Sequence, residues 1–242
     1  MRQYFINEIL TTGSNIVFSG DVAHHIKDVL RMKNDDEIRL VDDVGHIFLG
    51  KLVFDDNGVS ADIFEEISGQ HVNQPTVVCA ALIKKDKWEL MLQKAAELGA
   101  TLIVPIITNR TIIHLEDKEI DKKLERWNKI LLEACQQCNR SDICKIVEPV
   151  KLKDIDKYKS NTNILAYENE DGSHIVDYDL TDSVTIVIGP EGGFEYKEVE
   201  MLKEKGFNCA SLGNRILRAE TAVMYGLSVI DGERNRNEVC NL

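Results

Sequence analysis

After Pro75 the chain alternates short apolar runs with amphipathic segments, and this alternation constrains its fold more than any other feature. The intervening segments repeat apolar residues with a helical period of about 3.6. Strands joined through helices pair in parallel, so the region predicts a mostly parallel sheet with helices on its faces. The predicted strands cover residues 76–83, 102–107, 163–167 and 185–188.

The first helix after Pro75 shows the pattern well. From about Asp86, apolar residues recur at i, i+3, i+4 and i+7, and Gly99 stands where a left-handed cap is expected. Both tryptophans are expected in the core. Further helices are predicted from about 119 to 138, from 195 to 205 and from 219 to 230.

Residues 1–70 have a different character. Short strands are predicted at 37–41, 46–54 and 59–67, with Asp56-Asn57-Gly58 as a hairpin turn. A helix over 21–30 is predicted to group Val22, Ile26, Val29 and Leu30 on one face. Residues 68–75 have the composition of a linker. The sequence therefore predicts a small β domain over 1–70 and an α/β domain over 75–242.

Composition narrows the class of protein. No apolar run approaches the length of a membrane span and no cleavable signal is recognised, so a cytoplasmic location is expected. The six cysteines are too sparse for a disulfide scaffold and are expected to be free thiols. Cys135 and Cys138 form a C-x-x-C without a second pair, so no metal site is predicted.

The charge balance argues against nonspecific binding of nucleic acid. The formal net charge is −12, and residues 1–70 hold six Lys or Arg against thirteen Asp or Glu. Phosphate affinity depends on clustered cations, so any RNA binding would use a local basic groove with few, well-placed cations.

Two glycine-containing segments could carry chemistry. Gly189-Pro190-Glu191-Gly192-Gly193 and the segment 212–222, with the sequence LGNRILRAETA, each follow a strand and open a helix. Glycine lets a ligand approach backbone N–H and C=O groups closely. Neither segment matches the triphosphate-binding or dinucleotide-binding fingerprints. The segments therefore either bind a ligand of another class or bind no ligand.

Together these segments resemble the cofactor loops of the ribosomal RNA uridine-N3 methyltransferases, within the SPOUT superfamily. Lys84 to Gly99, ending in KAAELG, resembles that family's first helix, and the segment 24–31, HHIKDVLR, resembles its H-x-x-x-V-L-R helix. Cys144 stands where the family commonly has proline, which affects local detail only. The resemblance covers nearly the whole chain.

The resemblance implies a small PUA-like β-barrel that binds RNA, then a SPOUT α/β domain with a deep trefoil knot. It implies a homodimer, S-adenosyl-methionine as cofactor, no metal, and methylation of N3 of a uridine in small-subunit (16S) ribosomal RNA, in the assembled subunit. The implied cofactor-binding residues are Ile188, Gly189, Glu191, Gly192, Gly193, Leu212, Gly213, Ile216, Leu217, Glu220, Thr221 and Ala222, with Ile188, Leu212, Ile216 and Leu217 around the adenine.

Methylation at N3 also requires charge stabilisation and a proton acceptor. Arg218 is the leading candidate to stabilise the developing anion on uridine, followed by Arg140 and Arg110. Glu191 or Glu220 could accept the proton, although Glu220 could equally anchor a loop or interact with a helix dipole. Candidate RNA contacts are Arg2, His24, Lys27, Arg31, Lys84, Lys94, Arg110 and Arg140.

Three other interpretations remain open. The same scaffold could methylate a ribose 2′-oxygen or another base nitrogen. The chain could be an RNA-binding assembly protein without catalysis, although the intact glycines argue against this. It could also be a generic α/β binding domain, in which case Gly193→Val would alter little except stability.

Overall fold

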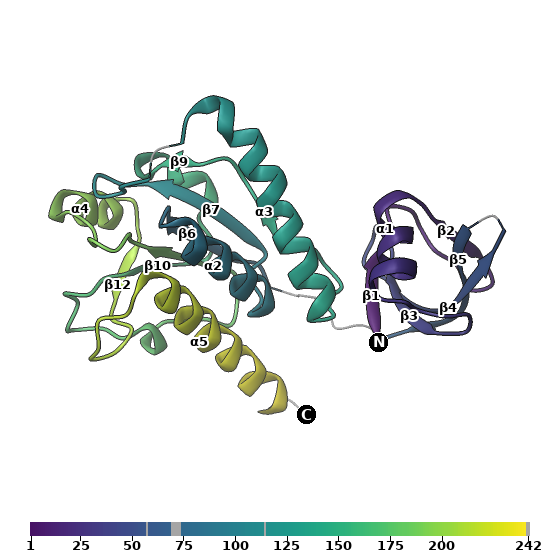
Figure 1. The fold of residues 1–242 in the computed structure, drawn as a ribbon. Coiled ribbons are helices and arrows are strands. Elements are labelled where there is room, and N and C mark those ends of the chain that lie inside the picture. The colour runs from purple at the N-terminus through teal and green to yellow at the C-terminus, as the bar shows by residue number, and fades with distance from the viewer. Residues whose placement is uncertain (57, 69–73, 114, 241–242) are drawn as a thin grey trace. The chain divides into compact units, whose positions relative to one another are not determined.

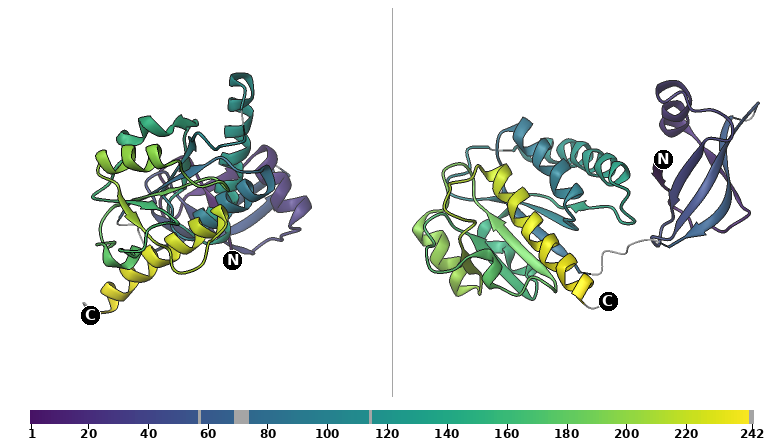
Figure 2. Two further views of the ribbon diagram at one scale, coloured as in Figure 1. Left: turned by 90° about the vertical axis from the view of Figure 1, so that its left-hand side faces the viewer. Right: turned by 90° about the horizontal axis from the view of Figure 1, so that it is seen from below.

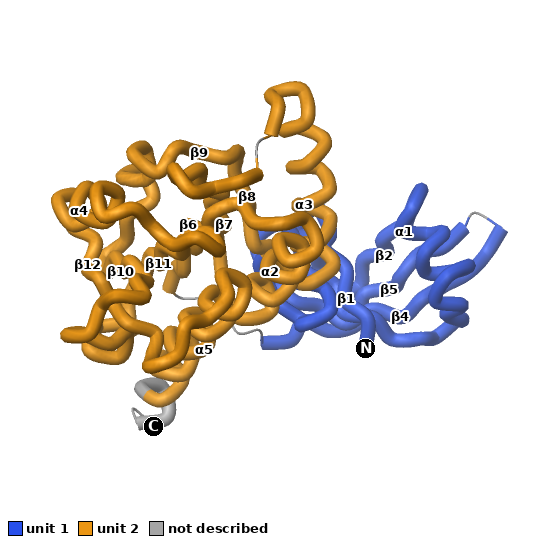
Figure 3. The backbone as a smooth tube through the Cα atoms, turned by 60° about the vertical axis from the view of Figure 1, so that its left-hand side comes forward, with its two compact units in different colours: residues 1–71, 135–142 blue, residues 72–134, 143–242 orange. Residues whose placement is uncertain are grey.

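The computed structural model describes residues 1–56, 58–68, 74–113 and 115–240, with side chains to residue 236. The chain divides into two compact units, each with its own hydrophobic core: residues 1–71 with 135–142, and residues 72–134 with 143–242 (Figure 3). The predicted turn residue Asn57, linker residues 69–73 and the Cys240 side chain lie outside this description.

The first unit is built on a sheet that curls around its core. In the described residues this sheet has the order β1-β3-β4-β5-β2, with β1 parallel to β3 and the other pairs antiparallel. A register shift between Leu49 and Gly50 marks a bulge, which bends the sheet. The strands are β1 (Arg2–Phe5), β2 (Asn15–Phe18), β3 (Glu37–Val41), β4 (Ile47–Asp55) and β5 (Gly58–Ile67).

The three predicted strands of this unit are confirmed, whereas β1 and β2 were not predicted. Both unpredicted strands have only four residues, too few for a period-2 pattern to stand out. They lie at the two edges of the sheet.

The helical segment before β3 differs from its prediction. It comprises α1 (Gly20–His24) and a π-helical turn, η1 (His25–Val29), in which Leu30 N donates to His25 O at 2.9 Å. Only Ile26 is buried, while Val22 and Val29 are 41% and 58% exposed. The predicted apolar face is therefore wrong, because a π-turn inserts a residue and rotates the following side chains off the α-helical stripe.

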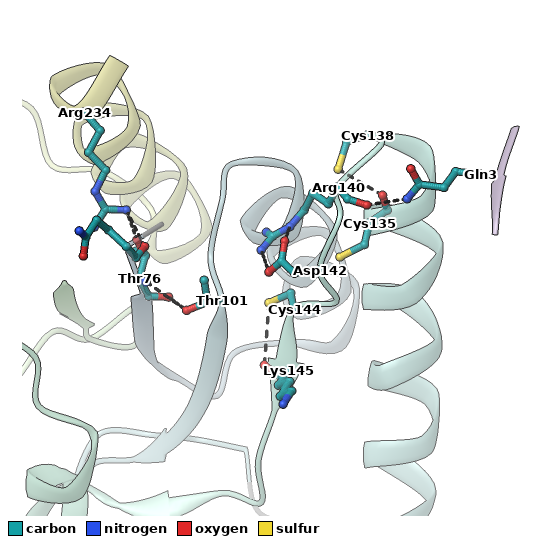
Figure 4. Close-up of polar contacts among 11 residues, drawn as sticks. Gln3, Thr76, Thr101, Cys135, Cys138, Arg140, Asp142, Cys144, Lys145 and Arg234 are labelled. Atoms are coloured by element: carbon teal, nitrogen blue, oxygen red, sulfur yellow. Dashed lines mark hydrogen bonds and ion pairs between the residues drawn. The ribbon is translucent and has the colours of Figure 1, made fainter. Parts of the chain in front are cut away.

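Residues 135–142 belong to the first unit although they follow most of a long helix. The Gln3 side-chain amide donates to the carbonyl oxygen of Arg140 at 2.6 Å (Figure 4). The Arg140 guanidinium pairs with Asp142, and its side chain is only 8% exposed. Nothing in the sequence indicated this attachment to β1.

The second unit is an α/β domain (Figures 1 and 2). Its described strands form a parallel sheet of order β12-β10-β11-β6-β7-β8, with β9 also paired to β7. These strands are β6 (Thr76–Ala81), β7 (Leu102–Ile107), β8 (Lys145–Ile146), β9 (Val150–Lys151), β10 (Thr162–Ala166), β11 (Val184–Ile188) and β12 (Asn208–Ala210).

Helices cover both faces of this sheet. On one face α5 packs against β6, β11 and α2, and α3 joins α2 through Trp88 and Trp127, whose ring centroids are 5.5 Å apart. On the other face α4 and η2 share a core with the opposite side of the strands. The helices are α2 (Lys85–Glu97), α3 (Asp117–Gln137), η2 (Leu152–Tyr158), η3 (Ile175–Asp177), α4 (Tyr196–Glu204) and α5 (Ala219–Cys240).

The predicted α/β alternation is confirmed, and Gly99 has the expected positive φ of 89° after α2. The four apolar residues predicted to form the buried face of α2, Trp88, Met91, Leu92 and Ala95, are buried. One boundary was wrong, because α5 continues to Cys240 rather than ending near Ile230. Within the described residues, none of the helices is long and apolar enough to cross a bilayer.

Candidate active site

A cavity of about 830 Å³ lies at the carboxyl ends of three neighbouring parallel strands, a size typical of small-ligand sites. The strands β10, β11 and β12 are adjacent in the sheet, and the cavity is lined by the segments that follow them, within 166–177, 188–193 and 211–222. Ligands of open α/β sheets bind at this end of the strands. The topology therefore brings both predicted glycine segments to one site.

The glycine segment after β11 contains two positions where a Cβ would collide with neighbouring side chains. Gly193 has φ +66°, and its N–H donates to Pro190 O at 2.9 Å to close the turn. A Cβ on Gly189 would stand 3.0 Å from the Phe194 ring, and a Cβ on Gly193 would collide with the Glu168 carboxylate. The loop therefore exposes backbone to the cavity in a conformation that favours glycine.

Two residues after β7 hold this loop in place. The Arg110 guanidinium donates to Gly192 O at 2.7 Å. Asn109 donates through its backbone N–H to the Glu198 carboxylate at 2.8 Å and through its amide to Glu195 at 2.9 Å. Because Glu195 and Glu198 also form the capping box of α4, the loop and the helix start are fixed together.

The segment after β12 is tied to the segment after β10. Ser211 N donates to Ser173 O at 2.8 Å, and Ile175 N donates to Ser211 O at 3.1 Å. Gly213 has φ +109°, and its N–H donates to the Ser211 hydroxyl at 3.1 Å. These bonds order two walls of the cavity.

The lining carries five carboxylates and two guanidiniums. The carboxylates are Glu168, Glu170, Asp171, Asp177 and Glu191, and the cations are Arg215 and Arg218. Arg218 is exposed, and no hydrogen bond or ion pair joins its guanidinium to another residue in the described part of the chain. The cavity suits a ligand that carries positive charge, with Arg218 available to a second, electron-rich group.

The two candidate proton acceptors lie in different environments. Glu191 is exposed and lines the cavity. Glu220 is 8% exposed, lies outside the lining and faces Lys87 of α2 at 3.8 Å, which suits the alternative role of anchoring α5. Thr221 is also outside the lining, and Ile216, expected around an adenine, lines the cavity but is 89% exposed.

The predicted RNA contacts are distributed over both units. Among those with a defined partner, His24 bonds Asp28 at 2.7 Å, Lys94 bonds Glu97 at 2.8 Å and Arg110 holds the glycine loop. The side chain of Arg140 is buried against Asp142 and does not line the cavity. The remaining predicted contacts, Arg2, Lys27, Arg31 and Lys84, are exposed.

Sequence reasoning missed the first wall of the cavity, residues 166–177. This segment holds four of the five lining carboxylates and also His174, whose ring meets Tyr225 edge to face with 6.5 Å between centroids. It carries no glycine-rich motif and no periodicity. The only available signal was its position after a buried strand.

No group of three or more His, Cys, Asp or Glu residues suited to a metal ion occurs among the described residues. The cysteines in that part of the chain form no disulfide. Burial raises the pKa of the Cys79 thiol to about 12, so this thiol is neutral in the folded protein.

Comparison with known proteins identifies the class. Residues 70–231 match a family model described as an RNA methyltransferase domain, and residues 18–64 match an RNA methyltransferase PUA domain. The chain thus contains an RNA methyltransferase domain and a PUA domain, and the predicted order of a PUA-like β domain followed by an α/β methyltransferase domain is confirmed.

Several relatives are more specific. The chain is 33% identical to ribosomal RNA small subunit methyltransferase E of Mesomycoplasma hyopneumoniae, covering 94% of this chain and 98% of the relative. It is 30% identical to the protein of the same name from Bacillus subtilis, covering 95% and 96%. The chain belongs to the ribosomal RNA small subunit methyltransferase E family.

Solved structures agree over both units. A methyltransferase of Legionella pneumophila in complex with S-adenosyl-methionine has a TM-score of 0.87 at 27% identity, covering 96% of this chain and 97% of that one. The family member from Neisseria gonorrhoeae, also bound to S-adenosyl-methionine, has a TM-score of 0.87 at 25% identity, covering 96% and 98%.

Proposed function

We propose that this protein transfers a methyl group from S-adenosyl-methionine to N3 of a uridine in small-subunit (16S) ribosomal RNA. The observation that carries the proposal is the cavity at the ends of β10, β11 and β12, whose walls contain both family segments. Family membership supplies the substrate class, and the relatives' name supports the small subunit.

The residues present fit the cofactor. Gly189 and Gly193 keep backbone at positions where a Cβ would collide with Phe194 or Glu168, and Gly213 has a positive φ in another wall of the cavity. The carboxylates of the lining match the positive charge of the cofactor, and backbone groups are free to meet its adenosine. When bound, S-adenosyl-methionine supplies an activated methyl group on its sulfonium, so the protein's task is positioning and charge.

Methylation of uridine at N3 requires removal of the proton that N3 carries. Loss of the N3 proton leaves negative charge shared among N3, O2 and O4, and this charge is consumed when N3 accepts the methyl group. Arg218, exposed in the cavity wall, is placed to stabilise that charge. Glu191 is the proposed proton acceptor, because Glu220 is held by Lys87 outside the lining.

The substrate requirement follows from the position of N3 on the Watson–Crick edge, which is reached only in an unpaired or flipped base. We propose that residues 1–70 supply RNA contacts, with residues 75–242 as the catalytic domain. The knot, the homodimer, the assembled subunit as substrate and the cytoplasmic location belong to the same proposal. Family resemblance supports the first two, and a ribosomal substrate supports the others.

The direct test uses purified protein, methyl-labelled S-adenosyl-methionine and small ribosomal subunits from a strain that lacks the modification. The labelled RNA is digested and the product nucleoside identified. We expect 3-methyluridine, and we expect assembled subunits to accept more label than naked RNA.

Other products distinguish the alternatives. Label that protects the adjacent phosphodiester from alkaline cleavage would indicate ribose 2′-O methylation. Absence of label together with absence of cofactor binding in calorimetry would indicate a non-catalytic RNA-binding protein. For the variant Arg218→Met, the matched control is Arg236→Met. It changes an exposed arginine on α5 that pairs with Glu233 and does not line the cavity.

A further inference from the structure

The Glu168 carboxylate lies against the glycine loop. Glu168 follows the end of β10 by two residues, and the loop follows the end of β11, which pairs with β10 in parallel. Its Cδ stands 3.2 Å from the place where a Cβ on Gly193 would be, and its Oε1 stands closer still. The carboxylate thus uses space that only a glycine leaves at this position.

Glu168 also carries a charge that the protein does not neutralise. It is exposed to the cavity, and no hydrogen bond or ion pair joins its carboxylate to another residue in the described ranges. Two neighbouring carboxylates are occupied with their own loop: Glu170 accepts from Gly172 N at 2.8 Å, and Asp177 accepts from His174 N at 2.7 Å. A carboxylate left without a partner at the cofactor loop is suited to a cationic ligand.

We propose that Glu168 is the counter-charge to the sulfonium of S-adenosyl-methionine and makes the cavity prefer this cofactor to its product. Methyl transfer turns the sulfonium into a neutral thioether, while the α-amino, carboxylate and adenosine groups stay the same. The Glu168 charge therefore favours binding of S-adenosyl-methionine over binding of S-adenosyl-homocysteine. The weaker binding of S-adenosyl-homocysteine helps its release. This inference rests on the proposed cofactor.

Calorimetry of the full chain tests the proposal with both ligands. The wild type should bind S-adenosyl-methionine more tightly than S-adenosyl-homocysteine. Glu168→Gln should lower the affinity for S-adenosyl-methionine by about fivefold, which is the effect of one partly exposed ion pair. It should change the affinity for S-adenosyl-homocysteine by less than about twofold. Equal weakening of both ligands, or no weakening, would overturn the proposal.

Asp171→Asn is the matched control. It removes another carboxylate from the same wall, but Asp171 is not among the atoms nearest Gly193. We expect it to change the ratio of the two affinities by less than about twofold, because a more distant exposed charge is screened. A change as large as that of Glu168→Gln would overturn the assignment to Glu168.

The wild type gives a test that needs no variant. Its preference for S-adenosyl-methionine should shrink as salt is raised from about 0.05 M to about 0.5 M, since screening weakens a charge contact. A preference that is absent or independent of salt would overturn the proposal even if Glu168→Gln failed to fold. If the wild type methylates RNA but lacks this preference, only the role of Glu168 fails; if it binds neither ligand, the proposed function fails as well.

Discussion

Arg218 is the residue proposed to contact the substrate uridine from the cavity wall. Its guanidinium is exposed, lines the cavity and has no partner among the described residues. For Arg218→Met we expect kcat to fall about 100-fold, the usual scale for removing one electrostatic stabiliser of a transition state. Affinity for S-adenosyl-methionine should stay within about twofold. Single-turnover methylation and calorimetry measure the two quantities, and a parallel loss of both would assign Arg218 to cofactor binding.

Gly193 tests whether the glycine loop is functional or merely a turn. Gly193→Ala places a methyl group on a backbone with φ +66° and against Glu168. We expect affinity for S-adenosyl-methionine to fall at least about tenfold and the free energy of unfolding to fall by about 1–2 kcal/mol. Gly232→Ala in α5, where a Cβ meets nothing within 4 Å, should leave binding intact and slightly raise stability. Unchanged binding in Gly193→Ala would favour a structural turn.

Cys79 makes stability depend on alkaline pH. Burial raises the pKa of its thiol to about 12, whereas an unfolded cysteine titrates near about 8.5. Between these values the unfolded chain binds fewer protons, so the free energy of unfolding falls as pH rises, by about 1.4 kcal/mol per pH unit from this group. Urea unfolding at pH 8 and pH 10 should show a steeper decline for the wild type than for Cys79→Ala. Equal declines would mean that another group controls the alkaline limb.

At the scale of elements, one arginine fastens the C-terminal helix. Arg234 of α5 donates to the Thr76 hydroxyl at 2.7 Å (Figure 4). It also donates to the backbone oxygens of Asp182 at 2.6 Å and of Leu180 and Gln74 at 3.1 Å. It thereby joins α5 to the starts of β6 and β11. Its own pKa is lowered by burial.

Removing this anchor should be costly. Arg234→Met leaves several acceptors without their donor, so we expect the free energy of unfolding to fall by about 3 kcal/mol. Arg236→Met, which loses only a surface pair with Glu233, should change it by less than about 0.5 kcal/mol. Urea denaturation measures both. A small effect of Arg234→Met would show that water replaces the guanidinium easily.

Elements were predictable from sequence where one period dominates. The predicted bounds of β7 are those observed, because a strand buried on both faces forms one continuous apolar run. The buried face of α2 was correct, because its apolar residues keep the helical period. The π-turn at His25 was not predictable, since its extra residue breaks the spacing on which the prediction depends. The attachment of Arg140 to Gln3 joins residues 137 positions apart and leaves no local signal.

The candidate site was predictable in part for the same reason. The glycine segments carry local motifs, and the sheet brings them together. Glu168 and the rest of the first wall became visible only when β10 was placed between β11 and β12. Glu220 stays a candidate proton acceptor, and its pairing with Lys87 could not be predicted because Lys87 lies on another helix.

At the scale of the whole molecule, a net charge of −12 must coexist with a polyanionic substrate. Residues 1–70 hold six Lys or Arg against thirteen Asp or Glu, and the cavity lining holds more carboxylates than guanidiniums. Long-range attraction to RNA is therefore weak, and affinity must come from a few close phosphate contacts and from the fit of one nucleotide.

This balance predicts a shallow salt dependence. For a single-stranded RNA that contains the target uridine, the slope of log K against log salt concentration should be about −3, as expected for roughly four phosphate contacts. Unrelated RNA should bind much more weakly at every salt concentration, because nonspecific binding depends on a broad basic surface, which a net charge of −12 disfavours. Fluorescence anisotropy at several salt concentrations gives both values. A slope near about −7, or equal affinity for unrelated RNA, would show that the exposed cations act together as a basic groove despite the acidic surface around them.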